Sequence, residues 1–164
     1  MRGDSRKRPR TAFRGRAADD FLVHQFPMVR RSQAREIAFQ LLYRDDLNPP
    51  GDPVEADARI RRRLGSDDLV EFAQRLVAGV RRHSQEIDAL IEQAAANWSL
   101  QRIAATDRNV IRLGAYEILH TDTPDRVAID EAVELAKRFG TAQSAQFVNG
   151  ILDKLMHREQ HGHS

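Results

Sequence analysis

Residues 106–119 read TDRNVIRLGAYEIL, a stretch crowded with apolar side chains at helical spacing. Thr106 or Asp107 can cap the start of such a helix, because both side chains accept hydrogen bonds from free backbone N–H groups. Glycine inside a helix costs about 1 kcal/mol relative to alanine, so Gly114 indicates that another helix crosses closely there. The stretch predicts a central, buried helix whose apolar side chains are Val110, Ile111, Leu113, Tyr116 and Ile118.

Two further helices are predicted after this stretch. The Thr123-Pro124-Asp125 sequence predicts the turn that separates them from the central helix. Residues 128–139 again place apolar side chains at helical spacing, and Gly140 is suited to end that helix. The apolar stripe of the last helix consists of Phe147, Val148, Ile151, Leu152 and Leu155.

The first helix is predicted between Ser32, as its N-cap, and about Leu47. The two prolines of residues 48–51 (NPPG) forbid its continuation. Residues 48–65 are polar and charged and are expected to form mostly a loop, with a turn of helix around residues 55–63 left open. The buried stripe of the first helix consists of Ala34, Ile37, Ala38, Leu41 and Leu42.

The chain between residues 66 and 103 is also helical in pattern. Ser66 is followed by two acidic residues, which favours the positive end of a helix dipole. Ser84 either restarts that helix or lies within it, and the apolar stripe continues to Trp98. Ser99 can cap a short helix that ends at Ile103.

No segment alternates polar and apolar residues with a period of two, so the sequence predicts an all-α fold of about six or seven helices. A chain of 164 residues fits one domain. The absence of cysteine excludes disulfides and zinc–thiolate sites. No apolar run approaches the roughly 20 residues of a spanning helix. Asp19 and Asp20 interrupt the only apolar segment after the basic amino terminus, so we expect no secretory signal. We therefore expect a cytoplasmic protein.

Charge is unevenly distributed along the chain. Residues 1–35 contain ten Lys or Arg and three Asp, whereas the other 129 residues contain sixteen basic and twenty-one acidic side chains. Arginine dominates the basic set, which favours phosphate and base recognition. Residues 1–27 lack any apolar period and are expected to form a disordered, arginine-rich extension, with residues 28–158 as the helical domain and residues 159–164 as a frayed tail.

A search for catalytic motifs finds no nucleophile elbow, P-loop, dinucleotide fingerprint or zinc-protease motif. The histidines lie near predicted helix ends or in the carboxy-terminal tail, where His157, His161 and His163 are better explained by fraying than by metal binding. The acidic clusters fit helix starts and solvated faces. We expect no enzymatic activity, no cofactor and no metal site.

The start of the first helix carries the strongest functional signal. Arg30, Arg31 and Arg35 surround a helix N-terminus, whose free N–H groups also favour phosphate. Phe39 and Tyr43 continue the ridge of Arg31 and Arg35 at intervals of four residues. Such a ridge can hold a phosphate backbone and stack unpaired bases. We interpret the three arginines as functional and the two aromatic residues as core.

Four stretches, in order and with compatible gaps, together resemble the NusB family of transcription antitermination factors. The first runs from Arg30 to Tyr43 and resembles the family's amino-terminal helix. Residues 107–113 with Tyr116 and Glu117 resemble its central helix. Residues 127–140 (VAIDEAVELAKRFG) and 147–155 (FVNGILDKL) are similar to its two closing motifs.

The resemblance implies two packed helical subdomains and no enzymatic activity. It implies binding of a single-stranded boxA element in ribosomal RNA leaders, together with the ribosomal protein NusE. Such a pair joins other Nus factors on RNA polymerase and suppresses premature termination.

The resemblance also implies two sets of contact residues. The expected RNA contacts are Arg30, Arg31, Arg35, Gln40, Gln146 and Phe147. The expected NusE contacts are Leu100, Ile103 and Asp107. Asp107 is explained equally well as a helix cap. Residues 141–146 read TAQSAQ, where the family often has acids followed by a basic residue, so the RNA contacts of this turn stay open.

Three other interpretations remain. The chain could be a protein-interaction module or a homodimer that covers its own RNA face. A NusB-like domain joined to a methyltransferase is disfavoured because no glycine-rich loop for a methyl donor is present. A helix-turn-helix DNA regulator is disfavoured because the arginines precede the first helix and do not line a second one.

Overall fold

A computed structural model describes residues 27–48, 51–96 and 98–161, apart from the side chains of residues 27–30 and 159–160. These residues form seven α-helices and one short 3₁₀ helix without any strand, which confirms the all-α prediction. In chain order the elements are α2 (Pro27–Leu47), α3 (Pro53–Arg63), α4 (Asp67–Arg82), α5 (Ser84–Ala94), η1 (Leu100–Arg102), α6 (Ala105–His120), α7 (Asp125–Phe139) and α8 (Ser144–His161).

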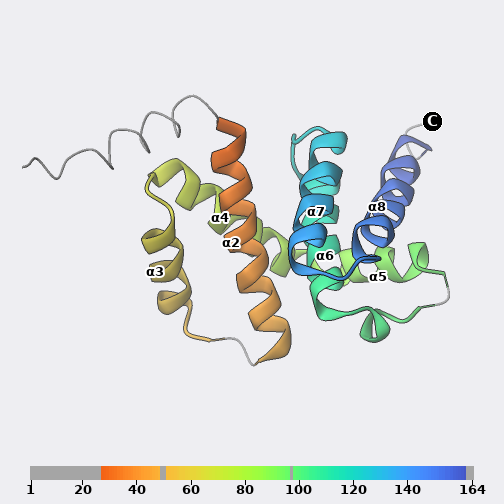
Figure 1. The fold of residues 1–164 in the computed structure, drawn as a ribbon, viewed down its shortest axis with the longest axis horizontal. Coiled ribbons are helices and arrows are strands. Elements are labelled where there is room, and N and C mark those ends of the chain that lie inside the picture. The colour runs from red at the N-terminus through yellow and green to blue at the C-terminus, as the bar shows by residue number, and fades with distance from the viewer. Residues whose placement is uncertain (1–26, 49–50, 97, 162–164) are drawn as a thin grey trace, which may run out of the picture.

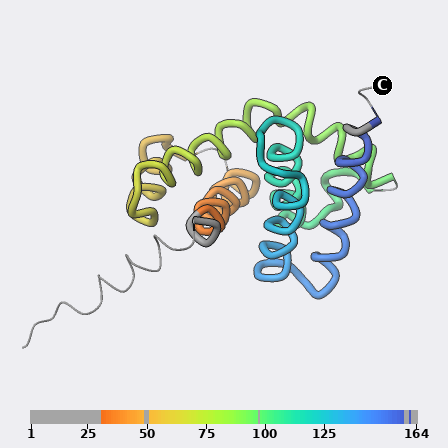
Figure 2. The backbone as a smooth tube through the Cα atoms, turned by 90° about the horizontal axis from the view of Figure 1, so that it is seen from above, coloured from red at the N-terminus to blue at the C-terminus, as the bar shows by residue number. Residues whose placement is uncertain are grey.

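The helices form two packed groups, as the resemblance implied. Helices α2, α3 and α4 form one group, and α5 to α8 form the other (Figure 1). Helix α4 leads directly into α5, and together they run along one side of both groups (Figure 2). Helix α6 packs against α2, α4, α5, α7 and α8, so it is the central element that the sequence predicted.

Gly114 lies where α6 meets α7 and α8. A Cβ atom at this position would lie 2.7 Å from Leu152 Cδ1 and 3.3 Å from Ala132 Cβ, so a larger residue would force the buried Leu152 side chain to move. This confirms the predicted close crossing. The neighbouring apolar residues of α6, including Val110 and Ile111, are fully buried.

Several predicted helix ends are confirmed. The Ser66 Oγ accepts a hydrogen bond from the Leu69 N–H at 3.3 Å and caps α4. Helix α4 ends before His83, so Ser84 begins the new helix α5 and does not continue α4. Gly140 is the C-cap of α7 in an extended conformation, and a Cβ there would lie 2.6 Å from Ser144 Cβ.

Residues 48–65 are more helical than predicted. Helix α3 spans 11 residues, whereas the sequence indicated mostly a loop. The Asp52 side chain caps it by accepting from the Val54 N–H at 2.9 Å, and Pro53 occupies its first position, where a missing N–H costs nothing. Ile60 is buried against the core and holds the polar helix in place.

Two predicted N-caps are wrong. Helix α2 begins at Pro27, so Ser32 lies inside it, and the Ser32 Oγ donates to Glu131 Oε1 at 2.7 Å. The N-cap of α6 is Ala104, without a side-chain bond, so neither Thr106 nor Asp107 caps this helix.

The predicted apolar stripe ends earlier than expected. Helix α5 ends at Ala94, and Trp98 is 55% exposed in the connection to η1 because no helix extends to it. The short helix after Ser99 is present as η1, although the Ser99 hydroxyl makes no cap bond.

Apart from Pro27, the predicted disordered extension 1–27 lies outside the described residues. Helix α8 continues to His161, so part of the expected frayed tail is helical, and residues 162–164 lie outside the description. Among the described helices none is long and apolar enough to cross a membrane.

Candidate nucleic-acid interface

Arg35, in the middle of α2, is a buried cation. Its side chain is 4% exposed, and its guanidinium binds the Glu117 carboxylate of α6 through two hydrogen bonds of 2.8 and 2.9 Å. A second carboxylate, Glu131 of α7, lies 3.7 Å away. An RNA contact by Arg35 would require breaking this pair, so its geometry is that of a residue that fixes α2 against α6 and α7.

Arg31 lies one turn earlier on α2 and is exposed. Its guanidinium carbon lies 5.1 Å from the centre of the Phe72 ring of α4, and that of Arg35 lies 5.2 Å from the same ring. Within the described residues, no carboxylate pairs with Arg31. The ring therefore orients a cation whose charge is still available to a phosphate. The side chain of Arg30 lies outside the described part of the structure.

Gln40 faces away from Arg31. Nine residues separate them, which is about two and a half helical turns, so they project from opposite sides of α2. The Gln40 Oε1 accepts a hydrogen bond from the Arg63 guanidinium at the end of α3, at 3.3 Å. Sequence reasoning did not identify Arg63, because α3 was expected to be mostly a loop.

The start of α8 holds the other two predicted RNA contacts. Gln146 is exposed and Phe147 is half-buried against the core. The preceding end of α7 contacts α2, where the Phe139 and Phe39 rings lie 5.2 Å apart. Phe39 is 3% exposed, which confirms that it belongs to the core.

An ion pair also joins this end of α7 to α2. Arg138 pairs with Glu36, which offsets the only acidic charge on that stretch of α2 between residues 31 and 44. The structure therefore does not bring all predicted RNA residues into one cluster. It places Arg31 beside α4, Gln40 beside α3, and Gln146 and Phe147 after α7.

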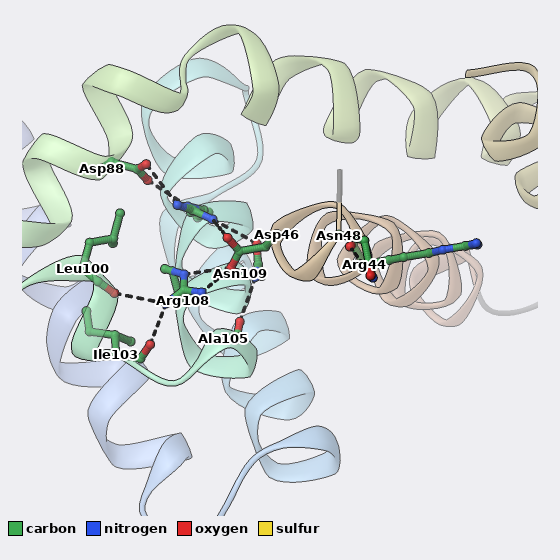
Figure 3. Close-up of polar contacts among 10 residues, drawn as sticks. Arg44, Asp46, Asn48, Asp88, Leu100, Ile103, Ala105, Arg108 and Asn109 are labelled. Carbon is green, nitrogen blue, oxygen red and sulfur yellow. Dashed lines mark hydrogen bonds and ion pairs between the residues drawn. The ribbon is translucent and has the colours of Figure 1, made fainter. Parts of the chain in front are cut away.

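A second polar cluster joins the end of α2 to the start of α6 (Figure 3). The Asp46 carboxylate accepts hydrogen bonds from Arg108 Nε at 2.8 Å and from Asn109 Nδ2 at 2.9 Å. Arg112 lies 3.5 Å from Asp46 and binds Asp88 of α5 at 2.8 and 3.0 Å. Three helices thus converge on a chain of alternating charges.

Arg108 also fixes the segment expected to contact NusE. Its Nη1 donates to the carbonyls of Leu100 at 3.2 Å and Ile103 at 2.8 Å (Figure 3). Ile103 is 3% exposed and Leu100 is half-buried, so Ile103 supports this surface from below. The Asp107 Oδ1 is buried without a hydrogen-bond partner within the described structure.

Trp98 lies beside this segment and is one of its exposed groups, although the sequence pattern assigned it to the core. The sequence signal that could have identified it is its place directly before Ser99, a predicted N-cap, since a residue at that position belongs to a connection and not to a helix interior. Exposed tryptophans are enriched among residues that dominate protein–protein binding.

The electrostatics of Asp46 follow from these contacts. Partial burial raises the pKa of Asp46, but hydrogen bonds from Arg108 and Asn109, with the charges of Arg108 and Arg112, outweigh that effect. The pKa of Asp46 therefore lies below its ordinary value. Burial likewise lowers the pKa of Arg112, but Asp88 and Asp46 raise it above its ordinary value, so both groups stay charged.

These features define an all-α protein that presents exposed cations on its first described helix and an exposed tryptophan beside η1. The chain belongs to the NusB family, whose family model matches residues 32–157. It is 44% identical over 131 residues to the transcription antitermination protein NusB of Anaeromyxobacter dehalogenans, covering 77% of this chain and 89% of that protein. It is 46% identical over 126 residues to that of Acidothermus cellulolyticus, covering 76% and 86%.

Solved structures show the same fold. NusB of T. maritima superimposes with a TM-score of 0.70 at 35% identity, covering 80% of this chain and 96% of that one. A NusB chain in a crystal structure of NusB and NusE with double-stranded RNA gives a TM-score of 0.70 at 32% identity, covering 80% and 98%.

The Asp46 cluster predicts a specific pH dependence. Because the folded-state pKa is depressed, the stabilisation is complete above the unfolded pKa of about 4 and is lost as pH falls through the folded pKa. We expect Asp46→Asn to lower the free energy of unfolding by about 1–3 kcal/mol at neutral pH. When the pH is lowered, the further decrease in the free energy of unfolding should be smaller for Asp46→Asn than for the wild type.

Urea denaturation between about pH 7 and pH 2 measures this difference. Asp130→Asn is the control, because Asp130 is exposed on α7. If the free energy of unfolding fell with decreasing pH equally for the wild type and Asp46→Asn, the stabilising role of ionised Asp46 would be contradicted.

Proposed function

We propose that this protein is a transcription antitermination factor that binds single-stranded, boxA-type RNA of ribosomal RNA leaders together with NusE. The observation that carries the proposal is the contrast between two neighbouring arginines. Arg35 is neutralised by a buried carboxylate, whereas Arg31 is exposed and unpaired within the described structure. The role we propose is one of binding, without catalysis.

The RNA contacts follow from this contrast. Arg30 and Arg31, at the start of α2, would bind phosphates, aided by the free N–H groups of the helix. Gln40 and the newly identified Arg63 would bind a second stretch of backbone, and Gln146 and Phe147 would contact unstacked bases. We assign Arg35 a positioning role, because its guanidinium is held by Glu117.

NusE would bind beside η1. Trp98 supplies an exposed aromatic anchor, Leu100 extends the apolar surface, and the buried Ile103 supports it. Asp107 lies in the first turn of α6 directly after this segment, and its buried Oδ1 has no hydrogen-bond partner within the described structure. Arg108 couples the surface to Asp46 at the end of α2.

The RNA part of the proposal is tested with Arg31→Ala. Loss of one phosphate contact should weaken binding by about tenfold and reduce the slope of log K against log salt by about 0.7. Fluorescence anisotropy of a labelled boxA-like RNA measures both quantities, with and without NusE. Arg158→Ala is the matched control, because this exposed arginine lies near the end of α8, far from α2 (Figure 1).

A scrambled RNA and a double-stranded RNA of equal length complete the titration. We expect both to bind more weakly than the boxA-like strand. Equal affinity for all three RNAs would show that the arginines bind nucleic acid without sequence preference. An unchanged slope of log K against log salt in Arg31→Ala would show that Arg31 does not contact an RNA phosphate.

The partner surface is tested through Trp98, the only tryptophan of the chain. Trp98→Ala should weaken NusE binding by at least about tenfold while leaving the fold intact, because the side chain is exposed. Titration calorimetry measures the affinity, with Val54→Ala on α3 as the control for loss of another exposed apolar side chain. Unchanged NusE affinity, or a change only in self-association, would contradict the assignment.

A further inference from the structure

Two histidines and a glutamate meet on the side of α6 that contacts α4 and α5. His83 occupies the break between α4 and α5, Glu86 lies in the first turn of α5, and His120 ends α6. The Glu86 Oε2 lies 3.1 Å from His120 Nε2 and 3.5 Å from His83 Nδ1. All three ligand atoms lie within 4.8 Å of one another.

The packing of α4 on α6 holds this cluster together. The two imidazole rings stack with centroids 3.8 Å apart, and Tyr116 lies 5.9 Å from the His120 ring, one turn earlier on α6. Tyr116 packs directly against Gly79, where a Cβ atom would collide with its ring. Gly79 therefore allows α6 to approach the α4–α5 junction closely enough for His83 and His120 to meet.

We propose that His83, Glu86 and His120 bind one divalent transition-metal cation of the Zn²⁺ type, with water as the fourth ligand. Two imidazole nitrogens and one carboxylate oxygen are ligands that such ions prefer, whereas Ca²⁺ and Mg²⁺ prefer oxygen alone. A tetrahedral ion with bonds of about 2.0–2.1 Å holds its ligand atoms about 3.4 Å apart. The two distances to Glu86 already bracket that value.

The surroundings also suit a cation. His120 is the last residue of α6, where the helix dipole is negative. The three side chains are 26–49% exposed, which leaves room for an ion to enter and for water to complete the shell. Binding requires the stacked rings to turn until both lone pairs point at one position, which their partial exposure permits.

A bound ion would add a metal link between the α4–α5 junction and the end of α6, beside the stacking of His83 on His120 and the hydrogen bond between Glu86 and His120. It would stabilise the folded state by mass action, since the unfolded chain does not hold these ligands together. The sequence does not predict this metal site, because only His83 and Glu86 lie close together in it and His120 follows 34 residues after Glu86.

The test uses a full-length variant in which the other four of the six histidines, His24, His157, His161 and His163, are replaced by alanine. This background excludes the tail histidines as the source of binding. Isothermal titration with Zn²⁺ should give one ion per chain, and Zn²⁺ should raise the melting temperature. Co²⁺ should give the intense visible absorption of a four-coordinate site.

His120→Ala and Glu86→Gln, made separately in this background, should each weaken Zn²⁺ binding by at least about tenfold, because even the loss of an outer partner costs that much. Circular dichroism without metal verifies that each variant folds. Absence of Zn²⁺ binding in the four-histidine variant would overturn the proposal. So would an affinity that neither His120→Ala nor Glu86→Gln reduces.

Discussion

The buried ion pair between Arg35 and Glu117 is the constraint on which the arrangement of the helices depends. Both side chains are almost completely removed from water, so each charge is tolerable only while the other is present. Their two parallel hydrogen bonds fix the rotation and the height of α2 relative to α6. The apolar core alone does not specify this register, because apolar contacts are non-directional.

The Asp46 cluster anchors the carboxy-terminal end of α2 to α6 and extends to α5 through Arg112. With the middle and the carboxy-terminal end of α2 fixed, the orientation of its remaining faces is determined, and Arg31 is left exposed near its start. The same cluster holds η1 through Arg108. One helix therefore positions both the proposed RNA contacts and the proposed partner surface.

The sequence predicted the helices well because apolar periodicity reports burial directly, and Gly114 correctly marked a close crossing. It predicted the site less well. Periodicity does not reveal which arginine is paired, so Arg31 and Arg35 were indistinguishable until Glu117 was placed beside one of them. Trp98 was assigned to the core because its spacing continued a stripe after the helix itself had ended.

The central claim is that Arg35 positions α2 and does not touch RNA. The most direct test is the affinity for boxA-like RNA of Glu117→Gln, which removes the carboxylate that holds Arg35 and leaves the arginine itself in place. We predict a folded variant, verified by circular dichroism, that binds RNA several-fold more weakly than the wild type, because α2 loses the ion pair that fixes its position on α6. A folded Glu117→Gln variant that binds RNA as tightly as the wild type, or more tightly because a contact arginine has been released, would contradict the claim.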